Sequence, residues 1–354
     1  MLALEMNRRV TRFLYRWRSC RRLFRFTNAG DKIASGTACA LMAAGLASAQ
    51  QPGKIEVLPV QGNIYMLAGA GGNITLQLGD NGVMVVDTGL APMSDQVIAE
   101  IRKLSKKPLR YVVNTDVKED HTGGNEAFSR EGGTSTVVNI VNTPGQSASQ
   151  TVQILGHEAI LDRMSAPIEK KPNSKTVRPS LAWPTDTFFD EPKELYFNGE
   201  SVQILHQPAA ITDGDSLVYF RRSDVVSAGD ILMTTGYPKI DLQNGGGIQG
   251  VLDGLNHILD LTIPAHHEEG GTMVIPGHGR ICDEADVMEY RDMVTIIRDR
   301  IRAMMKKGRT LEQIIASRPT MDYDGLYDVS RQSADAFVET VYKSLAIDVK
   351  AGKK

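Results

Sequence analysis

The sequence predicts a layered α/β fold, and three observations support this. Short segments rich in β-branched residues alternate with segments of helical periodicity. Turns rich in glycine, asparagine and aspartate separate many of these segments. A polar, glycine-rich loop, residues 114–125, directly follows one of the predicted strands. Because ligands commonly bind at the carboxyl ends of strands in such folds, this loop is the expected functional site.

The first half of the predicted fold combines short strands with one helix. Glycine-containing turns separate the first four strands, and the fifth ends at the polar loop. The expected strands are Ile55–Leu58, Ile64–Leu67, Ile74–Leu78, Val83–Val86 and Leu109–Val113, and the expected helix is Ser94–Lys103.

The second half repeats the alternation after a polar region. Residues 126–150 are predicted to form a surface loop around one short strand, Val137–Val141, and residues 167–184 a proline-rich loop. The expected strands are 152–155, 193–197, 202–206, 216–220, 224–227 and 272–275, with helices at 158–164 and 247–261.

The C-terminal region is predicted to be helical. From Glu284 to Lys306, apolar residues recur at spacings of three and four, and shorter helices are expected at about 310–316 and 332–345. The sequence therefore predicts a main domain, residues 50–283, with a helical extension, 284–354, packed on it. Apolar periodicity also fits a dimer contact, so the oligomeric state stays open.

The N-terminal segment has the order of a secretory signal: a long basic stretch, an apolar run and small residues, with cleavage expected after about Ala49. The apolar run, residues 33–46, is too short for a membrane span. Arg21 and Arg22 leave twin-arginine export open beside the general route. The unusual length of the basic stretch also leaves open a later true start, at Met6 or beyond. We expect a periplasmic or secreted protein; the alternative is a disordered basic arm.

Charge and cysteine content restrict the partners. Residues 1–49 contain nine basic and two acidic side chains, a formal charge of +7. Since the whole chain carries −2, the remaining 305 residues carry −9. That acidic balance gives no support for binding nucleic acid and argues against a nuclease. Cys282 alone would remain after cleavage, so no intramolecular disulfide is expected.

The polar loop resembles a known metal-binding motif. Its sequence, Asn114 to Asn125, resembles the loop His-x-His-x-Asp-His of the metallo-β-lactamase superfamily. Asp120 and His121 stand at the last two ligand positions. Asp116 and Lys118 stand where the family has histidines, and a protonated lysine cannot ligate a metal.

Further segments share the resemblance, in the family's order, across about 200 residues. Asp87 matches an aspartate that braces the metal loop, Asp230 the bridging ligand and His278 the last histidine. Ile211 stands where the family has another histidine. The resemblance implies a four-layer αββα sandwich with the metal site at one edge, between the two sheets.

The lost ligands all belong to one metal site of the family, and the retained ligands belong to the other. The first metal site loses all three of its own ligands, at Asp116, Lys118 and Ile211. The second site keeps its complete set, Asp120, His121, Asp230 and His278. The resemblance therefore implies one divalent metal, zinc by the usual ligand set. Manganese or iron becomes the alternative if Asp116 adds a third carboxylate.

The implied function is a secreted, metal-dependent hydrolase. Metal-bound hydroxide would attack the carbonyl of a small-molecule ester, thioester or lactam, with Asp120 orienting the metal-bound water. We hypothesise that the Lys118 charge replaces part of the missing metal's charge. It would pair with Asp116 or Asp230, or hold a substrate oxyanion.

The alternative is a non-catalytic protein of the same fold that holds no metal. Asp120, His121, Asp230 and His278 would then form a hydrogen-bonded polar cluster. A cation and an apolar side chain in the former metal cavity, Lys118 and Ile211, would suit an anionic organic ligand. Such a protein would act as a periplasmic binding or interaction partner.

The remaining histidines are expected to be structural. His157 is predicted to pack or to cap a helix, His206 to be a satisfied structural residue, and His257 to have no functional role. The run 266–269 is expected to be a solvated loop. Asp213 and Asp215 are expected to cap their own turn rather than to bind metal.

Overall fold

The computed structural model describes residues 53–132, 152–171, 174–264, 270–327 and 329–350. The predicted signal segment 1–49, the strand 137–141 and the run 266–269 lie outside the described residues. The chain separates into two units, residues 1–50 and 51–354, and everything described below belongs to the second. No described helix is both long and apolar enough to cross a membrane.

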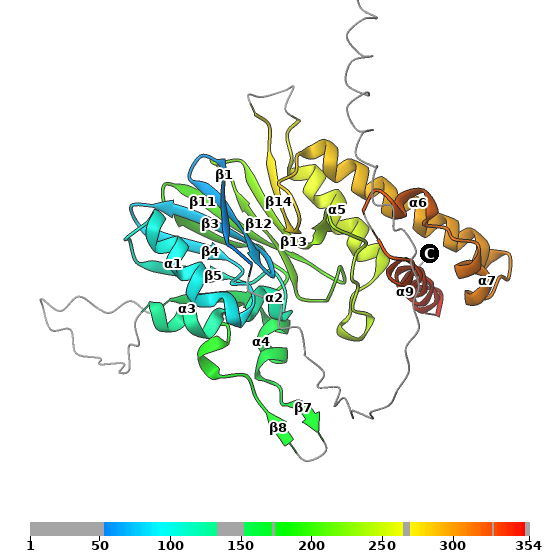
Figure 1. Cartoon of the computed structure of the whole chain (residues 1–354), viewed down its shortest axis with the longest axis horizontal. Coiled ribbons are helices and arrows are strands. Elements are labelled where there is room, and N and C mark those ends of the chain that lie inside the picture. Colours follow the sequence, from blue (N-terminus) through cyan, green and yellow to red (C-terminus); the bar gives the residue numbers. More distant parts are fainter. Residues whose placement is uncertain (1–52, 133–151, 172–173, 265–269, 328, 351–354) are drawn as a thin grey trace, which may run out of the picture. The chain divides into compact units, whose positions relative to one another are not determined.

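The first sheet has seven strands in the order β1-β2-β3-β4-β5-β6-β9 (Figure 1). The first four run antiparallel to one another, and β4, β5, β6 and β9 run parallel. The parallel strands therefore bring their carboxyl ends to one edge. The strands are β1 (Glu56–Gln61), β2 (Ile64–Ala70), β3 (Gly72–Gly79), β4 (Gly82–Val86), β5 (Leu109–Val113), β6 (Gln153–His157) and β9 (Asp186–Phe188).

The second sheet has five strands in the order β10-β11-β12-β13-β14. Only its last pair is parallel. The strands are β10 (Lys193–Phe197), β11 (Glu200–Gln207), β12 (Asp215–Phe220), β13 (Val225–Met233) and β14 (Met273–His278). A separate hairpin consists of β7 (Ile168–Lys171) and β8 (Ser174–Thr176).

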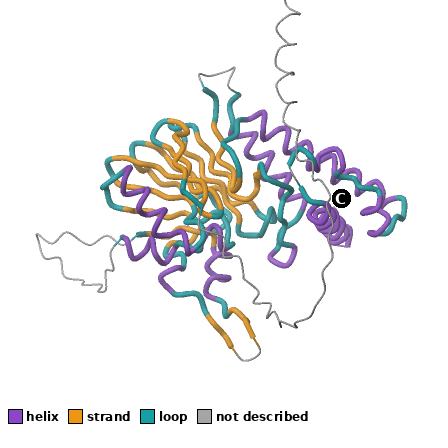
Figure 2. Tube along the Cα trace, in the orientation of Figure 1, coloured by secondary structure: helices purple, strands orange, loops and turns teal. Residues whose placement is uncertain are grey.

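Three apolar clusters give the molecule four layers, α, β, β and α. Figure 2 shows helices on both sides of the strands. The cluster between the sheets joins residues of both, such as Met84, Val113, Ile204 and Phe220. A second covers the outer face of the first sheet with α1 (Ser94–Leu104) and α3 (Asn125–Glu131). The predicted four-layer sandwich is confirmed.

The third cluster covers the outer face of the second sheet. Helices α5 (Ile248–Leu261), α6 (Glu284–Lys306), α7 (Leu311–Ala316) and α9 (Arg331–Lys350) supply its helical side. The C-terminal helices contact α5 and one another, so they share a core with the sandwich. The other helical elements are α2 (Glu119–Thr122), α4 (Glu158–Ser165), α8 (Met321–Asp324), η1 (Ala91–Met93), η2 (Ser180–Ala182) and η3 (Leu242–Asn244).

Two predicted loops are wrong in part. Residues 126–131 belong to helix α3, because Phe128 is fully buried in the cluster beneath α1 and outweighs the polar local composition. The proline-rich loop 167–184 contains the β7–β8 hairpin and the short helix η2. Both segments are short, and tertiary contacts override local propensity in such segments.

Candidate metal centre

The candidate residues meet at one edge, between the sheets. Asp87 follows β4, the motif loop follows β5, Asp230 lies in β13, and His278 ends β14. Close approach of β13 to the loop requires glycine at position 229, where φ is 53° and a Cβ atom would lie 2.7 Å from Thr115 Oγ1. The fold thus brings strands from both sheets to the same point.

Lys118 bridges two buried carboxylates. Its Nζ lies 2.8 Å from Asp116 Oδ2 and 2.7 Å from Asp230 Oδ2. Burial alone would lower the pKa of Lys118, but the two carboxylates outweigh it and raise the pKa above its ordinary value. Lys118 is therefore a permanent cation that contacts one of the lost first-site positions and the family's bridging aspartate.

His121 is fully buried and fixed from behind. Its Nδ1 lies 2.7 Å from Asp87 Oδ2, and that carboxylate also accepts hydrogen bonds from the Thr115 backbone N–H and hydroxyl at 2.8 and 2.6 Å. Asp87 has a φ of 62°, in the left-handed region that aspartate tolerates better than most residues. With Nδ1 engaged by Asp87, Nε2 is turned toward Asp230, whose Oδ1 is 3.2 Å away.

His278 completes the group from the other sheet. Its Nε2 lies 3.0 Å from Asp120 Oδ2 and 3.4 Å from Asp230 Oδ1. Asn73 holds the loop around it, because its side-chain amide donates to the carbonyls of Pro276 and Gly279 at 2.9 and 3.0 Å. Neither Asn73 nor Thr115 was predicted from the sequence. The Gly-Gly-Asn run at the start of β3, residues 71–73, is the only local signal for Asn73.

Four atoms of this group have the arrangement of a metal shell. They are Asp120 Oδ2, His278 Nε2, Asp230 Oδ1 and His121 Nε2, with successive separations of 3.0, 3.4 and 3.2 Å. Ligands about 2.1 Å from one zinc ion lie roughly 3.0–3.4 Å apart. Within the described residues, the last three atoms are buried and make no hydrogen bond. Such convergent, unpaired atoms fit a divalent ion.

The electrostatics of the group favour a cation. Four carboxylates and one ammonium leave three uncompensated negative charges when both imidazoles are neutral. Burial would lower the pKa of His121, but Asp116, Asp87 and Asp230 outweigh it and raise it well above 6.5. Burial would raise the pKa of Asp230, but His121, Lys118 and His278 hold it well below its usual value. His278 likewise lowers the pKa of Asp120.

Ile211 takes no part in this group. Its side chain is fully buried in the apolar cluster between the second sheet and the helices. Its backbone N–H donates to Asp215, which also accepts from the backbone N–H and hydroxyl of Thr212. Asp215 caps this turn, as predicted. The structure therefore brings together Asp116, Lys118, Asp120, His121, Asp230 and His278, and leaves Ile211 in the core.

His157, His206 and Asp190 lie within ligand distance of one another. The two imidazole rings stack with centroids 3.8 Å apart and planes 11° apart, so no single ion can lie in both ring planes. His157 Nδ1 accepts a hydrogen bond from Ala159 N–H at the start of α4, and His206 Nε2 lies 2.8 Å from the Asp213 carbonyl. This geometry agrees with the structural roles predicted for both histidines.

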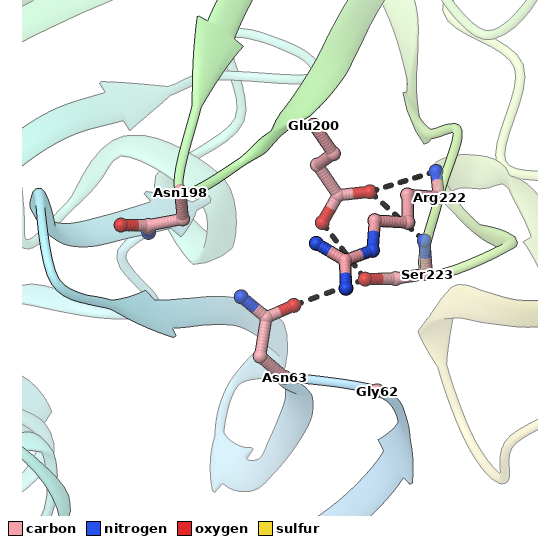
Figure 3. A pocket seen from close by; sticks show the side chains of 6 residues that line it. All are labelled: Gly62, Asn63, Asn198, Glu200, Arg222 and Ser223. Carbon is pink, nitrogen blue, oxygen red and sulfur yellow. Dashed lines mark hydrogen bonds between the residues drawn. The ribbon is translucent and has the colours of Figure 1, made fainter.

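A small polar pocket lies elsewhere, among turns that connect strands (Figure 3). It has a volume of about 290 Å³. The buried Glu200 carboxylate accepts hydrogen bonds from Gln77, from the Ser223 hydroxyl and from the backbone N–H groups of Arg222 and Ser223. The Ser223 hydroxyl also lies 2.9 Å from Asn63 Oδ1. Glu200 therefore ties together turns of both sheets, which is a structural role.

Comparisons with known proteins agree with this fold. The profile of the metallo-beta-lactamase superfamily matches residues 62–282. A linear primary-alkylsulfatase from Pseudomonas sp. (strain ATCC 19151) is 25% identical over an alignment of 271 residues, and the match covers 66% of this chain and 47% of that protein. The stereoselective inverting sec-alkylsulfatase from Pseudomonas sp. has a TM-score of 0.57 at 15% identity, covering 82% of this chain and 50% of its own.

A double mutant of a sec-alkylsulfatase gives a TM-score of 0.58 at 14% identity, with the same coverage. At these identities the solved structures show a shared fold. The chain spans about half the length of the relatives that it matches.

Proposed function

Because the chain belongs to the metallo-beta-lactamase superfamily, we propose that it is a hydrolase that works with one divalent metal ion. Asp120, His121, Asp230 and His278 would hold the ion, and Lys118 would supply positive charge in place of the ion that the family holds at its first site. The observation that carries this proposal is that the two carboxylate oxygens of Asp230 face different partners. Its Oδ2 contacts the Lys118 ammonium, while its Oδ1 faces the two histidines.

Asp120 is suited to handle a proton. A divalent ion such as zinc lowers the pKa of a coordinated water to about 7, which provides a nucleophile at neutral pH. The side chain of Asp120 is 25% exposed, whereas that of Asp230 is 2% exposed. Asp120 therefore lies at the opening of the site, where its carboxylate can orient water and accept a proton.

Lys118 is suited to bind an oxyanion. An ammonium has three N–H donors, and Asp116 and Asp230 accept two of them. Its side chain is 25% exposed, so the third donor can reach a substrate oxygen. A fixed cation at a developing negative charge is a common source of catalytic rate, because it needs no reorganisation during the reaction.

The substrate is proposed as a small ester, thioester or lactam, and the alkylsulfatase relatives add sulfate esters to this set. Export to the periplasm remains part of the proposal, on the signal-like order of residues 1–49. Members of one fold differ in substrate, so the reaction must be found by a screen of these classes.

Metal removal tests the proposed activity. We expect hydrolysis of at least one of these substrates, its loss after exhaustive chelation, and its return with Zn²⁺, Mn²⁺ or Fe²⁺. The screen compares the protein before chelation, after it and after metal is restored. Hydrolysis that continues at the same rate in the metal-free protein would exclude this mechanism.

A non-catalytic binding protein is the second candidate. The observation that favours it is the Lys118 ammonium between Asp116 and Asp230, which gives the former first site a compensating charge without metal. A protein with this role would fold fully and keep no ion after dialysis against each of the three metals.

Replacing Asp87 with asparagine tests how His121 is positioned. The substitution keeps the shape and tolerates the positive φ, but it loses the charge behind Nδ1 and one acceptor for Thr115. Loss of such an outer partner typically costs 10- to 100-fold in metal affinity, and we expect a loss of about that size. Competition with a chromophoric chelator measures it. Asp186→Asn, at a surface ion pair with Lys193, is the matched control. Equal affinities for both variants would refute the role.

A further inference from the structure

A cavity of about 540 Å³ lies between the loop that follows β13 and helix α9. Its volume is within the usual range for sites that bind small molecules. Met233 at the end of β13, Ile240 of the loop and Phe337 of the helix supply a buried apolar floor. We name this space, lined by parts of residues 233–240 and 329–340, the β13–α9 pocket.

The β13–α9 pocket begins close to the metal centre. Asp230 and Met233 lie three residues apart in β13. The next residue, Thr234, donates its backbone N–H to the His278 carbonyl at 3.0 Å. The loop that follows β13 therefore contacts the backbone of a proposed ligand, which places the pocket beside the metal centre.

The lining is amphiphilic. Hydroxyl groups of Thr235, Ser333 and Thr340 lie among the apolar side chains, and the exposed Lys239 adds a positive charge. Within the described part of the chain, Lys239 has no acidic partner at ion-pair distance. An apolar floor with an unpaired cation matches a molecule that joins an aliphatic chain to an anionic group.

We propose that the β13–α9 pocket binds the aliphatic chain of an anionic amphiphile, with its charged group near Lys239. The inference rests on the proposed function in one respect: such a molecule would be the substrate or the product of the metal site. Binding itself needs no metal ion, so it can be measured separately from hydrolysis.

Calorimetric titration of the full chain tests this, before and after metal removal. The probes are octanoate, decanoate and decyl sulfate, each below its micelle-forming concentration, and neutral decanol. Each added methylene should tighten binding about fourfold if the chain is buried. Decanoate and decyl sulfate distinguish carboxylate from sulfate as the preferred group. Affinity that is independent of chain length would overturn the proposal.

Two variants test the assignment to this pocket. Ala336→Trp places an indole at an exposed position of α9 that lines the pocket, and it should weaken decanoate at least tenfold. Gln332→Trp, exposed on the same helix but outside the lining, should leave binding unchanged. Lys239→Gln should weaken decanoate about fivefold and leave decanol unaffected. An unchanged decanoate affinity in Ala336→Trp would contradict the assignment.

The outcomes separate this inference from the proposed hydrolase. Chain-length-dependent binding that Ala336→Trp abolishes, in a protein without hydrolytic activity, supports the pocket and rejects the proposed function. If the protein hydrolyses a substrate, but neither the rate nor the substrate affinity changes with chain length or with Ala336→Trp, the result supports the hydrolase and rejects the pocket.

Discussion

The His278→Ala substitution is expected to lower the affinity of the protein for Zn²⁺ by about 100-fold or more. His278 Nε2 is one of the four convergent atoms and the only one that comes from β14. Loss of an outer-shell partner alone costs 10- to 100-fold, and loss of a direct ligand should cost at least the upper value. Hydrolysis should fall in parallel, because the same ion would supply the nucleophile.

Competition titration against a chromophoric chelator measures this affinity, and circular dichroism checks the fold. His257→Ala is the matched control, because His257 lies in α5 and contacts Gln207 rather than the metal centre. The two variants should differ in metal affinity and agree in secondary structure. If His278→Ala and His257→Ala bind Zn²⁺ equally well, the metal site is elsewhere.

The Lys118→Met substitution is expected to destabilise the metal-free protein by about 3 kcal/mol. It keeps an unbranched apolar stem, one atom shorter than lysine, but leaves Asp116 and Asp230, each 2% exposed, without their cation. Breaking a buried ion pair by removal of one partner typically costs about 3–5 kcal/mol, and we expect the lower value because Lys118 itself is partly exposed. Urea denaturation measures the change in the free energy of unfolding.

A double substitution shows whether the effect comes from this contact. Lys118→Met combined with Asp116→Asn removes one negative charge together with the positive one. The double variant should therefore be less destabilised than the sum of the two single variants. Additive effects, or a loss below about 0.5 kcal/mol in Lys118→Met, would show that the ammonium does not hold these carboxylates together.

Many helices and strands could be predicted from the sequence because apolar spacing and turn residues are local signals. Strand β5 and helix α6 have the boundaries expected from their apolar spacing and turns. Helix α3 was not predicted, because Phe128, its buried apolar residue, packs against residues that are distant in the sequence. The arrangement of the strands in two sheets came from the family resemblance and not from periodicity.

The candidate site shows the same division. The motif predicted that Asp120, His121, Asp230 and His278 would belong together, and the structure places them around one point. The sequence left open whether Lys118 pairs with Asp116 or Asp230, because spacing gives no distance across strands. The structure shows both contacts. The β13–α9 pocket could not be predicted from the sequence either, since the apolar periodicity of a helix does not show which residues pack against it.

The number of metal ions bound to each chain distinguishes a one-metal site from a two-metal site and from a site without metal. Native mass spectrometry of the protein, after loading with excess Zn²⁺ and removal of free metal, gives this number. We expect one ion per chain, since Lys118 contacts the bridging carboxylate of Asp230 beside the family's first metal site, whose histidines this chain lacks. Two ions, or none after loading with Zn²⁺, Mn²⁺ or Fe²⁺, would contradict it.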